Sequence, residues 1–131
     1  MKFNDFEIAL FIQSYIATMF WADAGEEDQI PSDGEINELA QELVERDCRA
    51  FLEKAEQQLL LALPSFDGNA NMLARAAHDF YLTRQGHGAG FWDSSELWVN
   101  GTDDTLTAIS HEFPDIYFYE GDDGSIYRGG S

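Results

Sequence analysis

The sequence predicts an α+β domain in which helices come first and a small antiparallel β-hairpin comes last. Three stretches with the helical spacing of apolar residues occupy residues 1–85, and Gly and Pro residues separate them. After residue 86 the chain is rich in glycine and aromatic residues, and it closes on two strand-like stretches around an Asp-Gly turn. We therefore expect one domain over 1–131, with a helical part, 1–85, and a second part, 86–131, containing a glycine-rich loop, a short helix and the hairpin.

The first helix is expected over residues 5–24. Asn4 is its predicted N-cap, Glu7 completes a capping box, and Gly25 ends the helix. Apolar residues surround almost the whole helix, which is more than one buried stripe requires. One possibility is a homodimer through an exposed patch of this helix, and the alternative is that the second helix covers it and completes the monomer. The residues expected in the patch are Phe11, Tyr15, Phe20 and Trp21.

The second helix is expected over residues 33–63, since Ser32 and Glu35 form another capping box and Pro64 ends the apolar pattern. Its apolar side begins with Ile36, Leu39, Leu43 and Ala50. Six glutamates fall in a single strip opposite that side, namely Glu35, Glu38, Glu42, Glu45, Glu53 and Glu56. A third helix is expected over residues 70–84, with Gly86 as its end.

The second part of the chain is predicted to hold shorter elements. A short strand is expected over residues 97–99, and a helix over 102–113 begins at Thr102 and ends before Pro114. The hairpin strands are expected over 116–120 and 125–128, on either side of the Gly121–Gly124 turn.

The charge of the chain excludes two classes of partner. Seven Lys and Arg residues against 25 Asp and Glu residues give a formal net charge of −18, which is opposite to what binding a phosphate backbone or an anionic membrane requires. We therefore expect no direct contact with nucleic acid or membrane. Cys48 is the single cysteine, so the chain shows no adaptation to an oxidising compartment and a cytoplasmic location is expected.

The glutamate strip suggests a partner of opposite charge. The first four glutamates advance by three or four residues, which is about 5 Å along a helix axis and comparable with phosphate spacing along a nucleic-acid strand. Such a strip suits a DNA mimic that presents carboxylates to a basic nucleic-acid-binding protein. The alternative is a solvated helix face that serves solubility alone.

Residues 78–93, with the sequence HDFYLTRQGHGAGFWD, resemble a block found in small uncharacterised proteins of bacteriophages and other mobile elements, whose usual form is similar to DFWLTRNGHGAGFWDR. A short helix containing Leu-Thr and a terminal hairpin similar to GDDGSIY follow in that family, so the resemblance covers about residues 75–128. The resemblance implies an accessory protein of a mobile element and brings no known activity. Gln85 replaces the usual Asn, and Ser94 replaces a usual basic residue.

The glycine-rich block itself allows two interpretations. A small enzyme or ligand-binding site would require Arg84, His87 and Asp93 to converge on the loop. The other interpretation is an irregular connection with glycines at positive φ, fixed to the core by Phe91 and Trp92. We favour the irregular connection because the loop follows a helix and lacks the residues of known phosphate loops. The net charge of −18 and the resemblance together favour a non-enzymatic protein.

No cofactor and no metal site are predicted. His78, Asp79, His87, Asp93 and His111 offer ligand atoms, but no pair of histidines has the i, i+4 spacing of a helical zinc site. Asp79 is expected to pair with Arg84 or to cap the loop, and Cys48 is expected to be structural.

Overall fold

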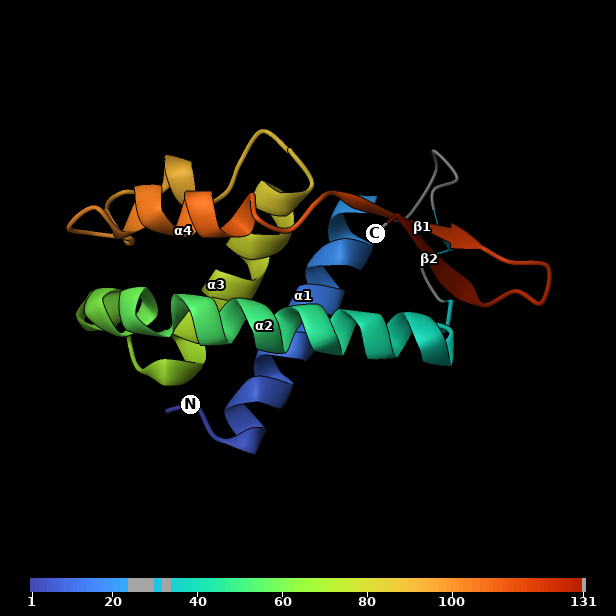
Figure 1. Cartoon of the computed structure of the whole chain (residues 1–131), viewed down its shortest axis with the longest axis horizontal. Coiled ribbons are helices and arrows are strands. Elements are labelled where there is room, and N and C mark those ends of the chain that lie inside the picture. The colour runs from blue at the N-terminus through green and yellow to red at the C-terminus, as the bar shows by residue number, and fades with distance from the viewer. Residues whose placement is uncertain (24–29, 32–33, 131) are drawn as a thin grey trace.

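Four helices precede a two-stranded antiparallel sheet in the computed structural model, which describes residues 1–23, 30–31 and 34–130 (Figure 1). The elements, in chain order, are α1 (Asp5–Asp23), α2 (Glu38–Ala62), the 3-10 turn η1 (Leu63–Ser65), α3 (Asn69–Arg84), the 3-10 turn η2 (Phe91–Asp93), α4 (Thr102–Ser110), β1 (Ile116–Glu120) and β2 (Ile126–Gly130). This order confirms the predicted α+β class.

Helix α2 runs across the whole molecule and organises the other elements around it (Figure 1). Helices α1 and α3 pack closely against each other behind α2, and α4 lies along another side of it. The hairpin lies beside the N-terminal end of α2 and contacts that helix through β2. The long helix therefore carries one face toward the core while its opposite face remains available to solvent.

The core is built on aromatic rings from several elements. Phe51 of α2 stacks on Phe80 of α3 with ring centroids 4.0 Å apart, and Phe11 of α1 lies 5.8 Å from Phe51. Phe91 of η2 continues the stack, with its centroid 6.0 Å from that of Phe51. All four rings are fully buried. Stacked rings of this kind join α1, α2, α3 and the glycine-rich loop into one apolar cluster.

The beginning of α1 confirms the predicted capping box. The Asn4 amide donates to Glu7 Oε1 at 3.0 Å, and the Glu7 amide donates to Asn4 Oδ1 at 2.8 Å. These two bonds satisfy amides that a helix start leaves without intrahelical partners. The predicted end at Gly25 lies outside the described residues.

The predicted start of the second helix is wrong. Helix α2 begins at Glu38, and the Asn37 side chain caps it by accepting from the amides of Leu39 and Ala40 at 3.0 and 3.4 Å. Ile36 lies before the helix and forms an isolated parallel bridge with Ile126 of β2. Pairing with the hairpin thus keeps residues 35–37 extended, while the predicted cap at Ser32 and start at residue 33 lie outside the described residues.

The predicted apolar side of α2 is also wrong in its first half. Leu39 is 62% exposed, and Leu43 and Ala50 are half-buried. The buried residues lie on a neighbouring face, which includes Ala40, Val44, Cys48, Phe51, Ala55 and Leu59. This face follows the i, i+4 spacing that packs on α1 and α3, so tertiary contact decides which apolar residues are buried.

Several boundaries after α2 differ from the expected ones. Helix α2 ends at Ala62, one residue before the predicted end, and α3 begins at Asn69, one residue before the predicted start. No strand forms over residues 97–99; the amides of Leu97 and Trp98 both donate to the Ser94 carbonyl at 3.0 Å and form turns. Helix α4 ends at Ser110 rather than at Phe113, and the second strand covers 126–130.

Candidate functional site

The predicted glutamate strip lies on the face of α2 that points away from the core. Glu38, Glu42 and Glu53 are exposed, while Glu45 and Glu56 are half-buried. Glu35 is exposed too, but it precedes α2 and its carbonyl accepts from the Ile126 amide of β2 at 2.8 Å. Five of the six glutamates therefore share one helix, from Glu38 to Glu56, over about 27 Å at 1.5 Å per residue.

Three carboxylates of the strip have no interaction partner in the described part of the chain. Glu38, Glu42 and Glu53 make no ion pair or side-chain hydrogen bond there, whereas Glu45 accepts from Gln41 Nε2 at 2.9 Å and Glu56 accepts from the Lys2 amide. Carboxylates without internal partners keep their full charge available for an external cation.

Arg49 lies within the strip of glutamates, and a prediction based only on the acidic residues there misses it. It is exposed and follows Glu45 by four residues and precedes Glu53 by four, so helical spacing places it on the same face. The strip is thus an acidic N-terminal stretch, one cation, and two further glutamates. The i, i+4 rule applied to the basic residues as well would have found it.

The most extensive polar cluster of the core centres on Asp47 of α2. Asp47 Oδ2 contacts Arg84 Nη1 of α3 at 2.9 Å and Arg128 Nη2 of β2 at 2.7 Å, and the side chains of both arginines are 1% exposed. Arg84 also donates from Nε to the Pro114 carbonyl at 2.8 Å and from Nη1 to Tyr15 Oη at 3.3 Å. The cluster joins three elements that lie far apart in sequence.

The charges in this cluster set the ionisation of its members. Burial by itself raises the pKa of Asp47, but the guanidinium groups of Arg84 and Arg128 outweigh burial and hold that pKa below its usual value. Burial raises the pKa of Tyr15 and of the Cys48 thiol, so both stay protonated. Cys48 is buried and free, in agreement with the structural role predicted for it.

A second buried carboxylate, Asp79, does not pair with Arg84 as expected. It accepts from Trp98 Nε1 at 2.8 Å and from Arg75 Nε at 3.0 Å, and burial raises its pKa in spite of these bonds. The buried aspartates, Asp47 and Asp79, thus match the buried guanidinium groups of Arg84 and Arg128 in number. Because the buried charges cancel, the formal net charge of −18 is carried by the residues outside these buried pairs.

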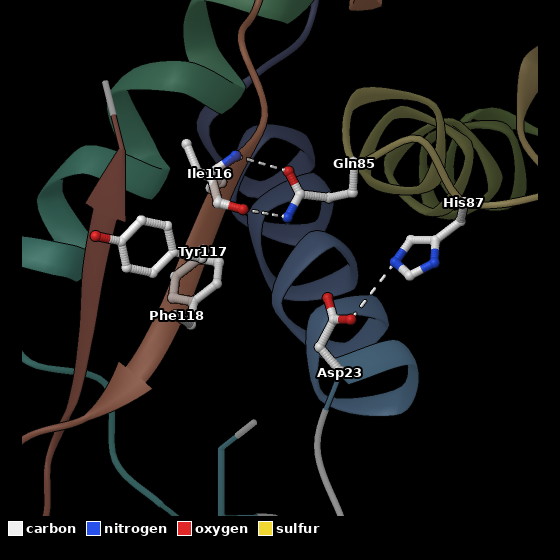
Figure 2. Close-up of a pocket in the computed structure, with 6 residues that line it drawn as sticks. All are labelled: Asp23, Gln85, His87, Ile116, Tyr117 and Phe118. Atoms are coloured by element: carbon white, nitrogen blue, oxygen red, sulfur yellow. Dashed lines mark hydrogen bonds and ion pairs between the residues drawn. The ribbon is translucent and has the colours of Figure 1, made fainter. Parts of the chain in front are cut away.

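The three predicted catalytic residues do not converge. Arg84 is buried in the Asp47 cluster, and Asp93 Oδ1 accepts from the Gly90 amide at 3.0 Å as a support of the loop. His87 Nε2 faces Asp23 Oδ1 at 3.5 Å, on the opposite side of the Gln85 side chain from β1 (Figure 2). Each of the three has its own partners, so the geometry does not support an acid–base site made of them.

A small cavity of about 200 Å³ lies between His87 and the start of β1, and Figure 2 shows the six residues that line it. Most polar groups that line it already have hydrogen-bond partners. Gln85 Nε2 donates to the Ile116 carbonyl at 2.6 Å, and Gln85 Oε1 accepts from the Ile116 backbone amide at 3.0 Å. Asp23 accepts from the Tyr81 hydroxyl and faces His87. These contacts fasten the start of β1 to the end of α3.

The glycine-rich loop is the irregular connection that the second interpretation expects. Gly86 and Gly90 have φ values of +73° and +151°, and Phe91 is fully buried. Trp92 is 49% exposed, so Phe91 alone of the two predicted anchors fixes the loop to the core. Two hydrogen bonds also hold the loop: the Phe91 amide donates to Thr83 Oγ1 at 3.1 Å, and the Gly90 amide donates to Asp93 Oδ1 at 3.0 Å.

The predicted patch on the first helix is smaller than expected. Phe11 and Tyr15 are fully buried against α2 and α3, Phe20 is half-buried, and Trp21 is 71% exposed. Phe6, at the other end of α1, is 78% exposed. The exposed aromatic surface of α1 is therefore divided between Phe6 at one end and Trp21, next to the half-buried Phe20, at the other.

Within the described ranges, no three His, Cys, Asp or Glu side chains come together in a group able to hold a metal ion. No helix among those residues is long and apolar enough to cross a membrane. Comparisons with protein-family models, curated proteins and solved structures found no match. The interpretation of function therefore rests on the charge and geometry of the chain itself.

Proposed function

We propose that this protein is a non-enzymatic cytoplasmic accessory protein of a phage or mobile element. It binds a basic, nucleic-acid-binding protein of the host or the phage and competes with nucleic acid for the basic surface. The observation that carries the proposal is the outward face of α2, where Glu38, Glu42 and Glu53 have no partner in the described part of the chain.

The use of the basic residues supports this proposal. Arg84 and Arg128 are buried with Asp47, while Arg75 pairs with Asp79 and Lys54 pairs with Glu112 at 2.8 Å. Few cations are left to neutralise carboxylates on the surface. A rigid helix then presents fixed negative charges at intervals close to those of a phosphate strand, which attracts a basic groove at long range.

The test uses two variants with the same change in net charge. One replaces Glu38, Glu42 and Glu53 by Gln, and the other changes Glu96→Gln, Asp104→Asn and Asp115→Asn, which are exposed positions outside α2. The tagged wild-type protein is expected to retain basic nucleic-acid-binding proteins from host lysate at about 50 mM salt and to release them at about 500 mM, where screening is strong. Added duplex DNA should displace the same proteins.

The α2 variant is expected to lose most of this retention and the matched control to keep it. Arg49→Gln, which removes the cation within the strip, should strengthen it. Equal losses in the two triple variants would show that net charge alone matters and would contradict the role given to α2. Failure to retain any such protein at the lower salt concentration would contradict the proposal as a whole.

A further inference from the structure

The outer face of the hairpin carries three tyrosine rings. Along β1, Tyr117 and Tyr119 point outward and are 60% and 44% exposed, while Ile116 and Phe118, which alternate with them, are buried. Tyr127 of β2 lies directly across from Tyr119 in the antiparallel register. The alternation of a β-strand thus places an aromatic surface on the side of the sheet that faces away from the core.

Two glycines allow these rings to lie flat on the strands. The centroids of Tyr119 and Tyr127 are 5.8 Å apart with planes inclined by 19°, and Tyr117 lies 6.0 Å from Tyr119. A Cβ atom on Gly129 would meet the Tyr117 ring at 2.2 Å, and one on Gly121 would meet the Tyr127 ring at 2.2 Å. The orientation of the rings therefore depends on the absence of side chains at these two positions.

Carboxylates surround the end of this aromatic surface. A shallow hollow at the hairpin tip is lined by Tyr119, Glu120, Gly121, Asp122, Asp123 and Tyr127. Asp123 Oδ1 accepts from the Ser125 amide at 2.9 Å, and Asp123 Oδ2 accepts from the Tyr127 hydroxyl at 2.8 Å. These bonds, first from Ser125 and then from Tyr127, lower the pKa of Asp123 and fix a charged carboxylate beside the rings.

We propose that this hollow binds the guanidinium group of an arginine side chain on the basic partner. A guanidinium is planar and stacks on an aromatic face, and its fork of N–H donors matches a carboxylate. The hollow offers both kinds of contact at once, through the Tyr119 and Tyr127 rings and the carboxylates of Glu120 and Asp122. An ammonium group lacks the planar stack, so this site favours arginine over lysine.

The position of the hollow fits the interface proposed on α2, and the inference rests on that proposed function. Ile126 follows the hairpin turn. Its amide donates to the Glu35 carbonyl at 2.8 Å, and its carbonyl accepts from the Asn37 amide at 2.7 Å. Asn37 caps α2 immediately before Glu38. A basic surface that lies along the N-terminal half of the glutamate strip therefore comes close to the hairpin.

The experiment compares two synthetic peptides of equal length and charge, one with arginine and one with lysine as its basic residues, by titration calorimetry at about 150 mM salt, where weak long-range attraction is screened. The wild-type protein is expected to bind the arginine peptide about threefold more tightly, because only a guanidinium combines stacking on a ring with a two-pronged bond to a carboxylate. Equal affinities for the two peptides would overturn the inference.

Variants of Tyr119 identify the source of the preference. Tyr119→Leu removes the ring from an exposed position and should bring the two affinities together, whereas Tyr119→Phe retains the ring and should retain the preference. A preference that survives in Tyr119→Leu would also overturn the inference, because it would arise elsewhere.

The triple glutamate variant of α2 separates this inference from the proposed function. This variant should weaken the binding of both peptides by a similar factor. The preference for arginine of about threefold should remain, since the Tyr119 and Tyr127 rings are unchanged. A loss of binding in that variant with no arginine preference in the wild type supports the function and refutes the inference. A preference that depends on Tyr119, with no effect of the α2 glutamates, does the reverse.

Discussion

Asp47 is the residue on which the interior depends most. Its carboxylate is the shared partner of Arg84 and Arg128, two guanidinium groups with almost no contact with water. Desolvating charges is costly, and the cost is recovered only when opposite charges stay in direct contact. Removing the carboxylate charge would leave both arginines buried without it, and Arg84 lies against the rings of Phe80 and Phe113.

We therefore predict that Asp47→Asn lowers the free energy of unfolding by about 3–5 kcal/mol at neutral pH, as expected for a broken buried ion pair. Urea denaturation followed by circular dichroism measures the change. Arg46→Ala is the control, since Arg46 also contacts Asp47 but its side chain is 60% exposed, and an exposed pair contributes at most about 1 kcal/mol. Similar losses in the two variants would contradict the special role of the buried arginines.

Comparison of the wild type with Asp47→Asn also tests how the stabilisation by Asp47 depends on pH. The pKa of Asp47 is lowered in the folded state, so on acidification the unfolded chain takes up a proton at this residue first, near its ordinary pKa of about 3.9. The stabilisation is thus complete above that pH and is lost as the pH falls through the lowered folded pKa. The difference between wild type and Asp47→Asn should shrink when the denaturation is repeated near pH 3; a difference that grows would contradict the direction of the shift.

Sequence patterns located the candidate residues but not their contacts. Arg84 was singled out for its place before the glycine-rich loop, yet it points into the core, and Asp47 looked like one acid among many on α2. The pairing of residues 47, 84 and 128 depends on how three elements pack, and no local periodicity contains that information. Helical spacing did predict the exposure of Glu38, Glu42 and Glu53, but it did not predict that Glu45 and Glu56 are half-buried.

The glycine-rich loop is the element whose geometry is most sensitive to substitution. Gly90 has a φ of +151°, and a Cβ there would lie 2.1 Å from Thr83 Oγ1, the atom that accepts from the Phe91 amide. Gly88 is exposed, and a Cβ at that position meets nothing within 4 Å. The two glycines therefore form a matched pair within one motif.

We predict that Gly90→Ala destabilises the protein by about 2–3 kcal/mol, the cost of a strained backbone together with displacement of Thr83. Gly88→Ala should change stability by no more than about 0.5 kcal/mol, as an open surface position does. Thermal unfolding of both variants beside the wild type measures this. Equal melting temperatures for the two variants would show that the loop is not fixed at Gly90.

Element types were more predictable than element boundaries. The Asn4 and Glu7 capping box and the hairpin around Gly121–Gly124 formed as expected, because short-range bonds determine them. The start of α2 was misplaced because Asn37 caps the helix after residues 35–37 pair with Ile126, a contact 90 residues away in sequence. Likewise, residues 97–99 form turns that place the Trp98 indole on Asp79.

At the scale of the whole molecule, repulsion between copies opposes self-association. Each chain carries −18, and the exposed aromatic rings of α1, Phe6 and Trp21, lie near opposite ends of the helix. Repulsion between two such chains weakens as salt screens it, while contact between apolar side chains does not. Salt should therefore act in opposite directions on self-association and on binding to a basic partner.

We predict that the protein sediments as a monomer at about 50 mM salt and forms a homodimer through the Trp21 end of α1 at about 500 mM, where the Debye length is only a few ångströms. The variant Trp21→Ser should stay monomeric under both conditions, because it removes a ring that is 71% exposed. Sedimentation velocity at tens of micromolar protein gives the result. A wild-type monomer at both salt concentrations would contradict the proposed dimer.

The position of Arg128 has a consequence for the order in which the chain can fold. Asp47 and Arg128 are separated by 81 residues, so their contact closes a loop that contains α3, α4 and β1. Of the two buried arginines, only Arg84 can reach Asp47 before residue 128 has been synthesised, so the cluster is completed last from the C-terminal end. Such distant contacts form late, because loop closure costs entropy before it brings any stabilisation. The C-terminal hairpin is thus the last piece of the interior to be locked in place.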